Sequence, residues 1–152
     1  MKNAPVFLLL LALGLPSHAF AADRQSFWFS FRKAFLKKDF RALATMSSFP
    51  VEVLGMADSD PVLRLDEKSF KPCFLQIYRR DSGMSEKGET HEAYVRRVKK
   101  VPAIEKGSQF RMGDLQFQSV HGTFKLIRIY LDTADPRVTK VCGEPALLKP
   151  IH

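Results

Sequence analysis

The chain has 152 residues, of which 45% are hydrophobic and 26% are charged. These fractions are typical of a globular protein and exclude disorder over the whole length. Lysine and arginine outnumber aspartate and glutamate by 24 to 16, which gives a formal net charge of +8. Net charge by itself is better evidence of solubility than of a particular binding partner.

The first 21 residues have the pattern of a cleavable signal peptide. Lys2 supplies a positive start, residues 6–13 are apolar, and Ala19-Phe20-Ala21 is a small-x-small cleavage motif. The apolar run is shorter than the roughly 20 residues that span a bilayer. We therefore expect an exported chain with a signal peptide over residues 1–21, one α+β domain over residues 22–132 and a tail over residues 133–152.

The expected export limits the classes of partner that the chain can meet. No lipobox cysteine stands beside the cleavage motif, so a periplasmic or secreted location without a lipid anchor is expected. Exported proteins seldom meet nucleic acid, and none is expected as a partner. The basic run over residues 96–100 would suit an anionic envelope surface, although a solvated helix face accounts for it equally well.

The two cysteines are Cys73 and Cys142. An even count in an oxidising compartment favours a disulfide. Such a bridge would close a loop of about 70 residues and stabilise the fold by about 4 kcal/mol in the chain-entropy model. The alternative is two reduced thiols buried as small apolar groups.

Two helices are predicted near the N-terminus. Phe27, Phe31 and Phe35 recur every fourth residue within a helix expected over Asp23–Lys38. Asp39 has the position of an N-cap for a short second helix. The aromatic stripe could line an apolar ligand channel, but core packing is the default interpretation.

A hairpin follows the helices. Val51–Leu54 and Val62–Leu65 are predicted strands, joined by a turn over Asp58–Pro61. Asp58 and Asp60 could together bind a metal or share a proton, but aspartates at such positions usually stabilise turns. No metal site is therefore expected.

A third helix is predicted after the hairpin, capped by Asp66 or Ser69 and with Pro72 in its first two turns. A fourth helix is predicted over Thr90–Lys100 and ends at Pro102. The apolar positions of the third helix recur at helical spacing, namely Phe70, Cys73, Phe74, Ile77 and Tyr78.

Two long strands are expected over Phe110–Val120 and Phe124–Asp132, with a tight turn at His121–Thr123. The tail over Thr133–His152 contains three prolines and is expected to be extended over the surface. The order of elements predicts an α+β fold with N-terminal helices packed on a curved, mostly antiparallel sheet.

The pattern of side chains in the last predicted strand indicates a ligand pocket on one face of the sheet. Strict alternation would place Arg128 and Tyr130 on the same face as Phe124 and Leu126. An arginine in a mostly apolar cavity suits a carboxylate ligand. Alternatively, the face with Ile127 is the core and Arg128 is solvated. The candidate ligand-pocket residues are Trp28, Tyr78, Arg128 and Tyr130.

Four segments carry a resemblance to a known family: residues 27–35, residues 38–44, residues 49–55 with the helix start at 66–74, and residues 112–117 with 122–130. In these segments the chain resembles the nuclear-transport-factor-2-like superfamily, whose fold is an α+β cone. The resemblance implies a curved sheet wrapped by helices around a central pocket. It also implies a range of activities: isomerases, dehydratases and polyketide cyclases, binders of small ligands, and proteins that bind partners or form homodimers through the sheet. Enzymatic members place an Asp or His acid/base inside the cone.

No catalytic residue can be assigned from the sequence. His91 near a helix start could act as a general base, but it is expected at the surface, as are His121 and His152. No nucleophile elbow, phosphate-binding loop or dinucleotide motif is present, so no cofactor is expected. The favoured function is a module that binds a small apolar or anionic ligand or a protein. The alternative is a small isomerase, dehydratase or cyclase with an acid/base residue in its pocket.

Overall fold

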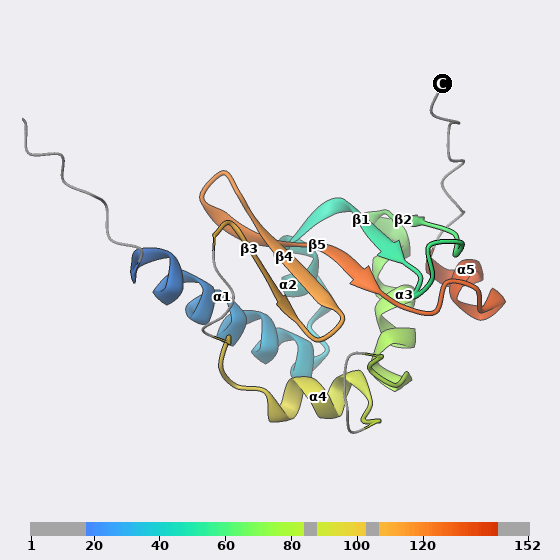
Figure 1. The fold of residues 1–152 in the computed structure, drawn as a ribbon, viewed down its shortest axis with the longest axis horizontal. Coiled ribbons are helices and arrows are strands. Elements are labelled where there is room, and N and C mark those ends of the chain that lie inside the picture. Colours follow the sequence, from blue (N-terminus) through green and yellow to red (C-terminus); the bar gives the residue numbers. More distant parts are fainter. Residues whose placement is uncertain (1–17, 84–87, 103–106, 143–152) are drawn as a thin grey trace, which may run out of the picture.

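The computed structural model describes residues 18–83, 88–102 and 107–142. These residues form an α+β fold, as predicted (Figure 1). Its elements in chain order are α1 (His18–Lys37), α2 (Phe40–Thr45), β1 (Ser47–Leu54), β2 (Leu63–Leu65), α3 (Glu67–Arg79), α4 (His91–Arg97), β3 (Gln109–Met112), β4 (Leu115–Val120), β5 (Thr123–Tyr130) and α5 (Pro136–Cys142).

The strands form one mixed five-stranded sheet in the order β2-β1-β5-β4-β3. Strand β1 pairs with β2 in the predicted hairpin, and β4 and β5 are antiparallel neighbours as expected. The pairing of β1 with β5 is parallel, which brings the first strand of the chain beside the last. Strands β2 and β3 lie at the two edges, so the sheet is open.

Three of the helices begin at side-chain caps. The Asp39 carboxylate accepts a hydrogen bond from the Ala42 N–H at 3.0 Å and starts α2. Asp66, one of the two predicted candidates, caps α3 by accepting from the Ser69 N–H at 2.8 Å. Thr90 caps α4 through its hydroxyl. Each cap satisfies a backbone donor that the helix itself leaves unpaired.

Helix α1 begins at His18, earlier than the predicted Asp23. Its aromatic stripe packs on the sheet: the ring centroids of Phe27 and Phe31 lie 5.3 Å and 4.9 Å from that of Phe117. Phe31 and Phe35 are fully buried. The stripe therefore forms the core between α1 and the sheet.

The prediction of one strand over Phe110–Val120 was wrong. The segment forms two antiparallel strands, β3 and β4, which are joined by a turn at Gly113 and Asp114. Gly113 has a φ of +59°, a conformation in the left-handed region that favours glycine. A Cβ atom at this position would also lie 2.8 Å from the Tyr94 ring. The turn therefore requires glycine for two reasons.

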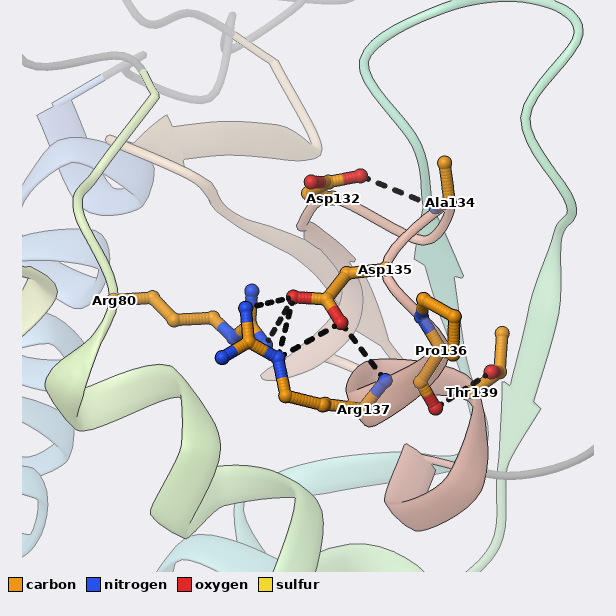
Figure 2. Close-up of polar contacts among 7 residues, drawn as sticks. All are labelled: Arg80, Asp132, Ala134, Asp135, Pro136, Arg137 and Thr139. Atoms are coloured by element: carbon orange, nitrogen blue, oxygen red, sulfur yellow. Dashed lines mark hydrogen bonds and ion pairs between the residues drawn. The ribbon is translucent and has the colours of Figure 1, made fainter.

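The tail is not extended throughout, because residues 136–142 form α5. The Asp135 carboxylate accepts from the Arg137 N–H at 2.8 Å, and Pro136 occupies the first helical position, where its missing N–H costs nothing. Figure 2 shows the guanidinium groups of Arg80 and Arg137 on this carboxylate. Hydrogen bonds from Arg137 and Arg80 hold the pKa of Asp135 well below its usual range.

Cys73 and Cys142 form a disulfide, as predicted, which joins α3 to α5. The remainder of the predicted tail, residues 143–152, lies outside the described residues, as do residues 1–17 of the predicted signal peptide. Helix α1 contains the predicted cleavage motif, and cleavage there stays a prediction. In the described part of the chain, no helix combines the length and hydrophobicity needed to cross a membrane.

Candidate functional site

A β-bulge in the last strand decides which side chains share a face. Phe117 of β4 pairs with Leu126, but its neighbour Gln116 pairs with Arg128, so Ile127 is an extra residue in β5. Such a residue reverses the alternation of the strand. The prediction that Arg128 and Tyr130 lie on the face of Phe124 and Leu126 was therefore wrong. They lie on the opposite face.

That opposite face, which we call the outer face, carries polar side chains on every strand. Its side chains are partly or fully exposed, whereas Phe117, Leu126 and Ile129 on the inner face are buried. The sheet register aligns one residue from each strand in a single row, the outer row: Arg64, Glu52, Arg128, Gln116 and Arg111.

Arg128 at the centre of the outer row is already engaged. Its Nε donates to Glu52 Oε2 at 2.9 Å, and its Nη1 donates to Gln116 Oε1 at 3.3 Å. The hydrogen bond with Glu52 raises the pKa of the Arg128 guanidinium above its ordinary value. Because its charge is compensated by Glu52, Arg128 is poorly suited to bind a carboxylate ligand.

Arg111 is held in place without a carboxylate. Its guanidinium lies over the Tyr130 ring, 3.8 Å from the centroid, and its Nε donates to the Gly113 carbonyl at 2.9 Å. Tyr130 is in turn oriented by the hydrogen bond from its hydroxyl to Gln116 Oε1 at 3.2 Å. The terminal nitrogens of Arg111 are thus positioned by a stacked ring and one fixed hydrogen bond.

A groove of about 420 Å³ adjoins this stack at the end of β1. The loop over residues 55–62 forms one wall and is closed by Asp60, whose Oδ2 accepts from the Ala57 N–H at 2.9 Å. This confirms that the turn uses an aspartate. The lining residues are Leu54, Gly55, Met56, Ala57, Asp58, Asp60, Val62, Arg111 and Tyr130.

A second groove, of about 350 Å³, shares Met56 and Tyr130 with the first. Two of its charged lining residues already have partners. Arg80 donates to Asp135 at 2.9 Å, and Asp132 accepts from the Ala134 N–H at 3.2 Å (Figure 2). The first groove, with Arg111, is the candidate binding site because its arginine is held in place by the stack on Tyr130.

The four predicted pocket residues do not meet at one place. Trp28 is fully buried, and its indole N–H donates to the Val98 carbonyl at 3.1 Å. Tyr78 is buried in the core, where its hydroxyl donates to the Phe35 carbonyl. Burial raises the pKa of Tyr78 above its ordinary value. Only Tyr130 of the four lines a groove, while Arg128 lies beside it in the outer row.

His91 is buried, contrary to the prediction of a surface position. Its Nδ1 lies 3.0 Å from the Arg80 carbonyl, and its Nε2 lies 2.8 Å from Asp114 Oδ2, off the direction of an ideal hydrogen bond. Both ring nitrogens therefore face oxygen atoms, which ties α4 to the end of α3 and to the turn between β3 and β4. His121 is exposed as predicted, and His152 lies outside the described residues.

Asp114, in the turn after Gly113, also accepts from the Ser82 hydroxyl at 2.8 Å. Burial of the Asp114 carboxyl opposes its ionisation, but the contacts with His91 and Ser82 outweigh burial and hold its pKa below the usual range. Asp114 thereby links β3 and β4 to α4 and to the end of α3. Across residues 18–83, 88–102 and 107–142, no group of three potential metal ligands is present.

The sequence does not single out Arg111 as a site residue, because the pattern predicts one long strand over Phe110–Val120 with Arg111 inside it. The dipeptide Gly113-Asp114 between two apolar-polar alternations is a recognised hairpin signal and would have revealed the turn. The bulge at Ile127 has no comparable signal. It became visible only through the pairing of β5 with its neighbours.

The chain was compared with models of protein families, with curated proteins and with solved structures, and nothing matched. A function for this chain therefore has to be inferred from the chemistry of its own side chains.

Proposed function

We propose that this chain is an exported, non-catalytic binding module that recognises a carboxylate group in the groove beside Arg111. The export of the chain is supported by the signal-peptide pattern over residues 1–21 and by the disulfide between Cys73 and Cys142, since disulfides persist in oxidising compartments. The nuclear-transport-factor-2-like fold is part of the proposal. It is supported by the helical layer on one face of a mixed sheet.

The interior of the fold favours binding on the outer face. Where the resemblance implies a central pocket, aromatic rings pack between α1 and the sheet, with Phe31, Phe110 and Phe117 buried in contact. The buried ionisable pair, His91 and Asp114, lines neither groove. No observation among the described residues thus favours the alternative of an acid–base enzyme over a binding module.

The observation that carries the proposal is the orientation of Arg111. A guanidinium donates two parallel hydrogen bonds to a carboxylate, and it does so at a lower entropic cost when it is already held in place. Stacking on Tyr130 and the hydrogen bond to Gly113 hold Arg111 in the lining of the groove. The apolar floor formed by Leu54 and Val62 suits the hydrocarbon part of such a ligand.

The proposal is tested by titrating ¹⁵N-labelled protein with hexanoate and following amide chemical shifts by NMR. We expect saturable shifts at Gly55 and Arg111, and no binding of the neutral analogue hexanamide. Arg111→Gln should weaken hexanoate binding by at least about tenfold, because a hydrogen-bonded charge is lost. Arg64→Gln, at the far end of the outer row and exposed, is the matched control and should bind normally. Equal binding of hexanoate and hexanamide would contradict the proposal.

A further inference from the structure

Opposite charges occupy separate walls of the groove beside Arg111. Arg111 projects from β3, and Asp58 belongs to the loop between β1 and β2. Across the described ranges, neither side chain takes part in an ion pair. The positive charge of Arg111 does reach Asp114, but that carboxylate is buried and already bound by His91 and Ser82.

Asp58 differs from its neighbour Asp60 in the same wall. Asp60 is required by the loop: its carboxylate accepts the Ala57 N–H, and its Cβ lies against Gly55, where no side chain would fit. Asp58 is exposed, and no hydrogen bond or ion pair ties it to the described part of the loop. The loop therefore does not need the Asp58 carboxylate, which remains available to a cation in the groove.

Apolar side chains line the same groove as the two charges. Leu54, Val62 and the Tyr130 ring line it, together with Met56 and Ala57. Apolar groups compensate neither charge, and they favour a ligand whose middle part is hydrocarbon or peptide-like. The volume of about 420 Å³ is at the small end of ligand sites, which suits a molecule of about dipeptide size.

We propose that the groove binds a short zwitterionic chain, with its carboxylate at Arg111, its ammonium group at Asp58 and its apolar middle over Leu54 and Val62. A dipeptide or a similar short peptide with free ends is the ligand class. This inference rests on the proposed carboxylate-binding function and adds to it recognition of a second, cationic end.

The test compares hexanoate with 6-aminohexanoate, which has the same hydrocarbon chain and differs by a terminal ammonium group. We expect 6-aminohexanoate to bind the wild-type chain about fivefold more tightly, as one added ion pair at an exposed site allows. Asp58→Asn should remove this advantage, so that the variant binds 6-aminohexanoate no more tightly than it binds hexanoate. Ser59→Ala, the exposed neighbour that does not line the groove, should retain the advantage.

The outcomes separate this inference from the function on which it rests. Hexanoate that binds through Arg111, with no gain from the ammonium group, would overturn the zwitterionic ligand and leave carboxylate binding in place. Failure of both ligands to bind would overturn both proposals. Alanyl-leucine should displace 6-aminohexanoate from the groove, measured at the same amide resonances. Absence of competition would overturn the assignment of the ligand class to peptides.

Discussion

Arg128 and Arg111 show how the surroundings of a residue decide its use. Both are arginines of the outer row, and both touch the network around Gln116 and Tyr130. Glu52 compensates the charge of Arg128, so that this residue stabilises the sheet surface. Arg111 has a ring and a carbonyl as partners, which fix its direction without a direct ion pair among the described residues. An arginine thus stabilises the sheet surface on β5, whereas an arginine on β3 is left without a carboxylate partner in the described part of the chain.

At the residue scale we predict that Ser82→Ala shifts acid unfolding to higher pH. The pKa of Asp114 is lowered in the fold, so its stabilising contribution is complete above the unfolded pKa of about 3.9 and is lost as the pH falls through the folded value. Without the Ser82 hydroxyl, which donates to Asp114 Oδ2, the folded pKa rises and the loss begins earlier. Stability at neutral pH should also fall by about 1–3 kcal/mol.

Urea unfolding at a series of pH values measures both effects. Ser30→Ala is the control, because the Ser30 hydroxyl is exposed and bonds only within α1. It should change stability by no more than about 0.5 kcal/mol at any pH. If the two variants have the same acid midpoint, Ser82 does not stabilise the Asp114 carboxylate.

At the scale of elements, β5 pairs with both β1 and β4 and contains a bulge at Ile127. Before the bulge Phe124 and Leu126 face the core, and after it Ile129 does. The inner face is thus apolar along the whole strand although the sequence does not alternate regularly. The same shift places Arg128 and Tyr130 on the outer face, where charge and hydroxyl groups are solvated or paired.

Substitutions at adjacent positions of β5 should differ strongly in effect. Leu126→Asp should unfold the domain, because Leu126 is fully buried and an unpaired carboxylate there costs several kcal/mol. Lys125→Gln on the outer face should be tolerated within about 1 kcal/mol. Circular dichroism and thermal unfolding check both variants. A soluble Leu126→Asp protein with wild-type stability would show that the strand is placed incorrectly.

The disulfide should contribute substantially to stability. Cys73 and Cys142 are separated by 69 residues, and a loop of this length corresponds to about 4 kcal/mol in the chain-entropy model. Replacing both cysteines by alanine should lower the free energy of unfolding by about that amount, as measured in urea. Addition of a reductant should destabilise the wild-type protein and leave the double variant unchanged. Two alkylatable thiols in protein purified without reductant would contradict the bridge.

At the scale of the molecule, the sheet has two unlike faces. One packs against α1 through aromatic rings, and the other carries the outer row. Figure 1 shows the β3–β4 hairpin on the α1 side of the sheet, with α3 and α5 near the β1–β2 end. An apolar interior on one side of the sheet thus leaves the polar side exposed, and it is on this side that we propose ligand binding.

The aromatic core should account for much of the global stability. Phe31 is fully buried and contacts Phe27, Trp28, Phe35 and Phe117. Phe31→Ala should destabilise the protein by about 3–5 kcal/mol through lost contacts and a cavity. Phe29→Ala on the same helix removes the same atoms from a side chain that is 61% exposed, and should change stability by about 0.5 kcal/mol or less. Similar values for the two variants would contradict the packing of α1.

The amino-acid sequence by itself determined the helices of the first two-thirds of the chain, the β1–β2 hairpin and the disulfide. Helix caps and helical spacing act over a few residues, so they can be recognised in the sequence. Examples are the caps Asp39 and Asp66 and the spacing of Phe70, Phe74 and Ile77. Tertiary structure decided the rest. The bulge at Ile127 and the parallel pairing of β1 with β5 depend on strands far apart in sequence, and they place Arg111, Tyr130 and Asp58 around one groove.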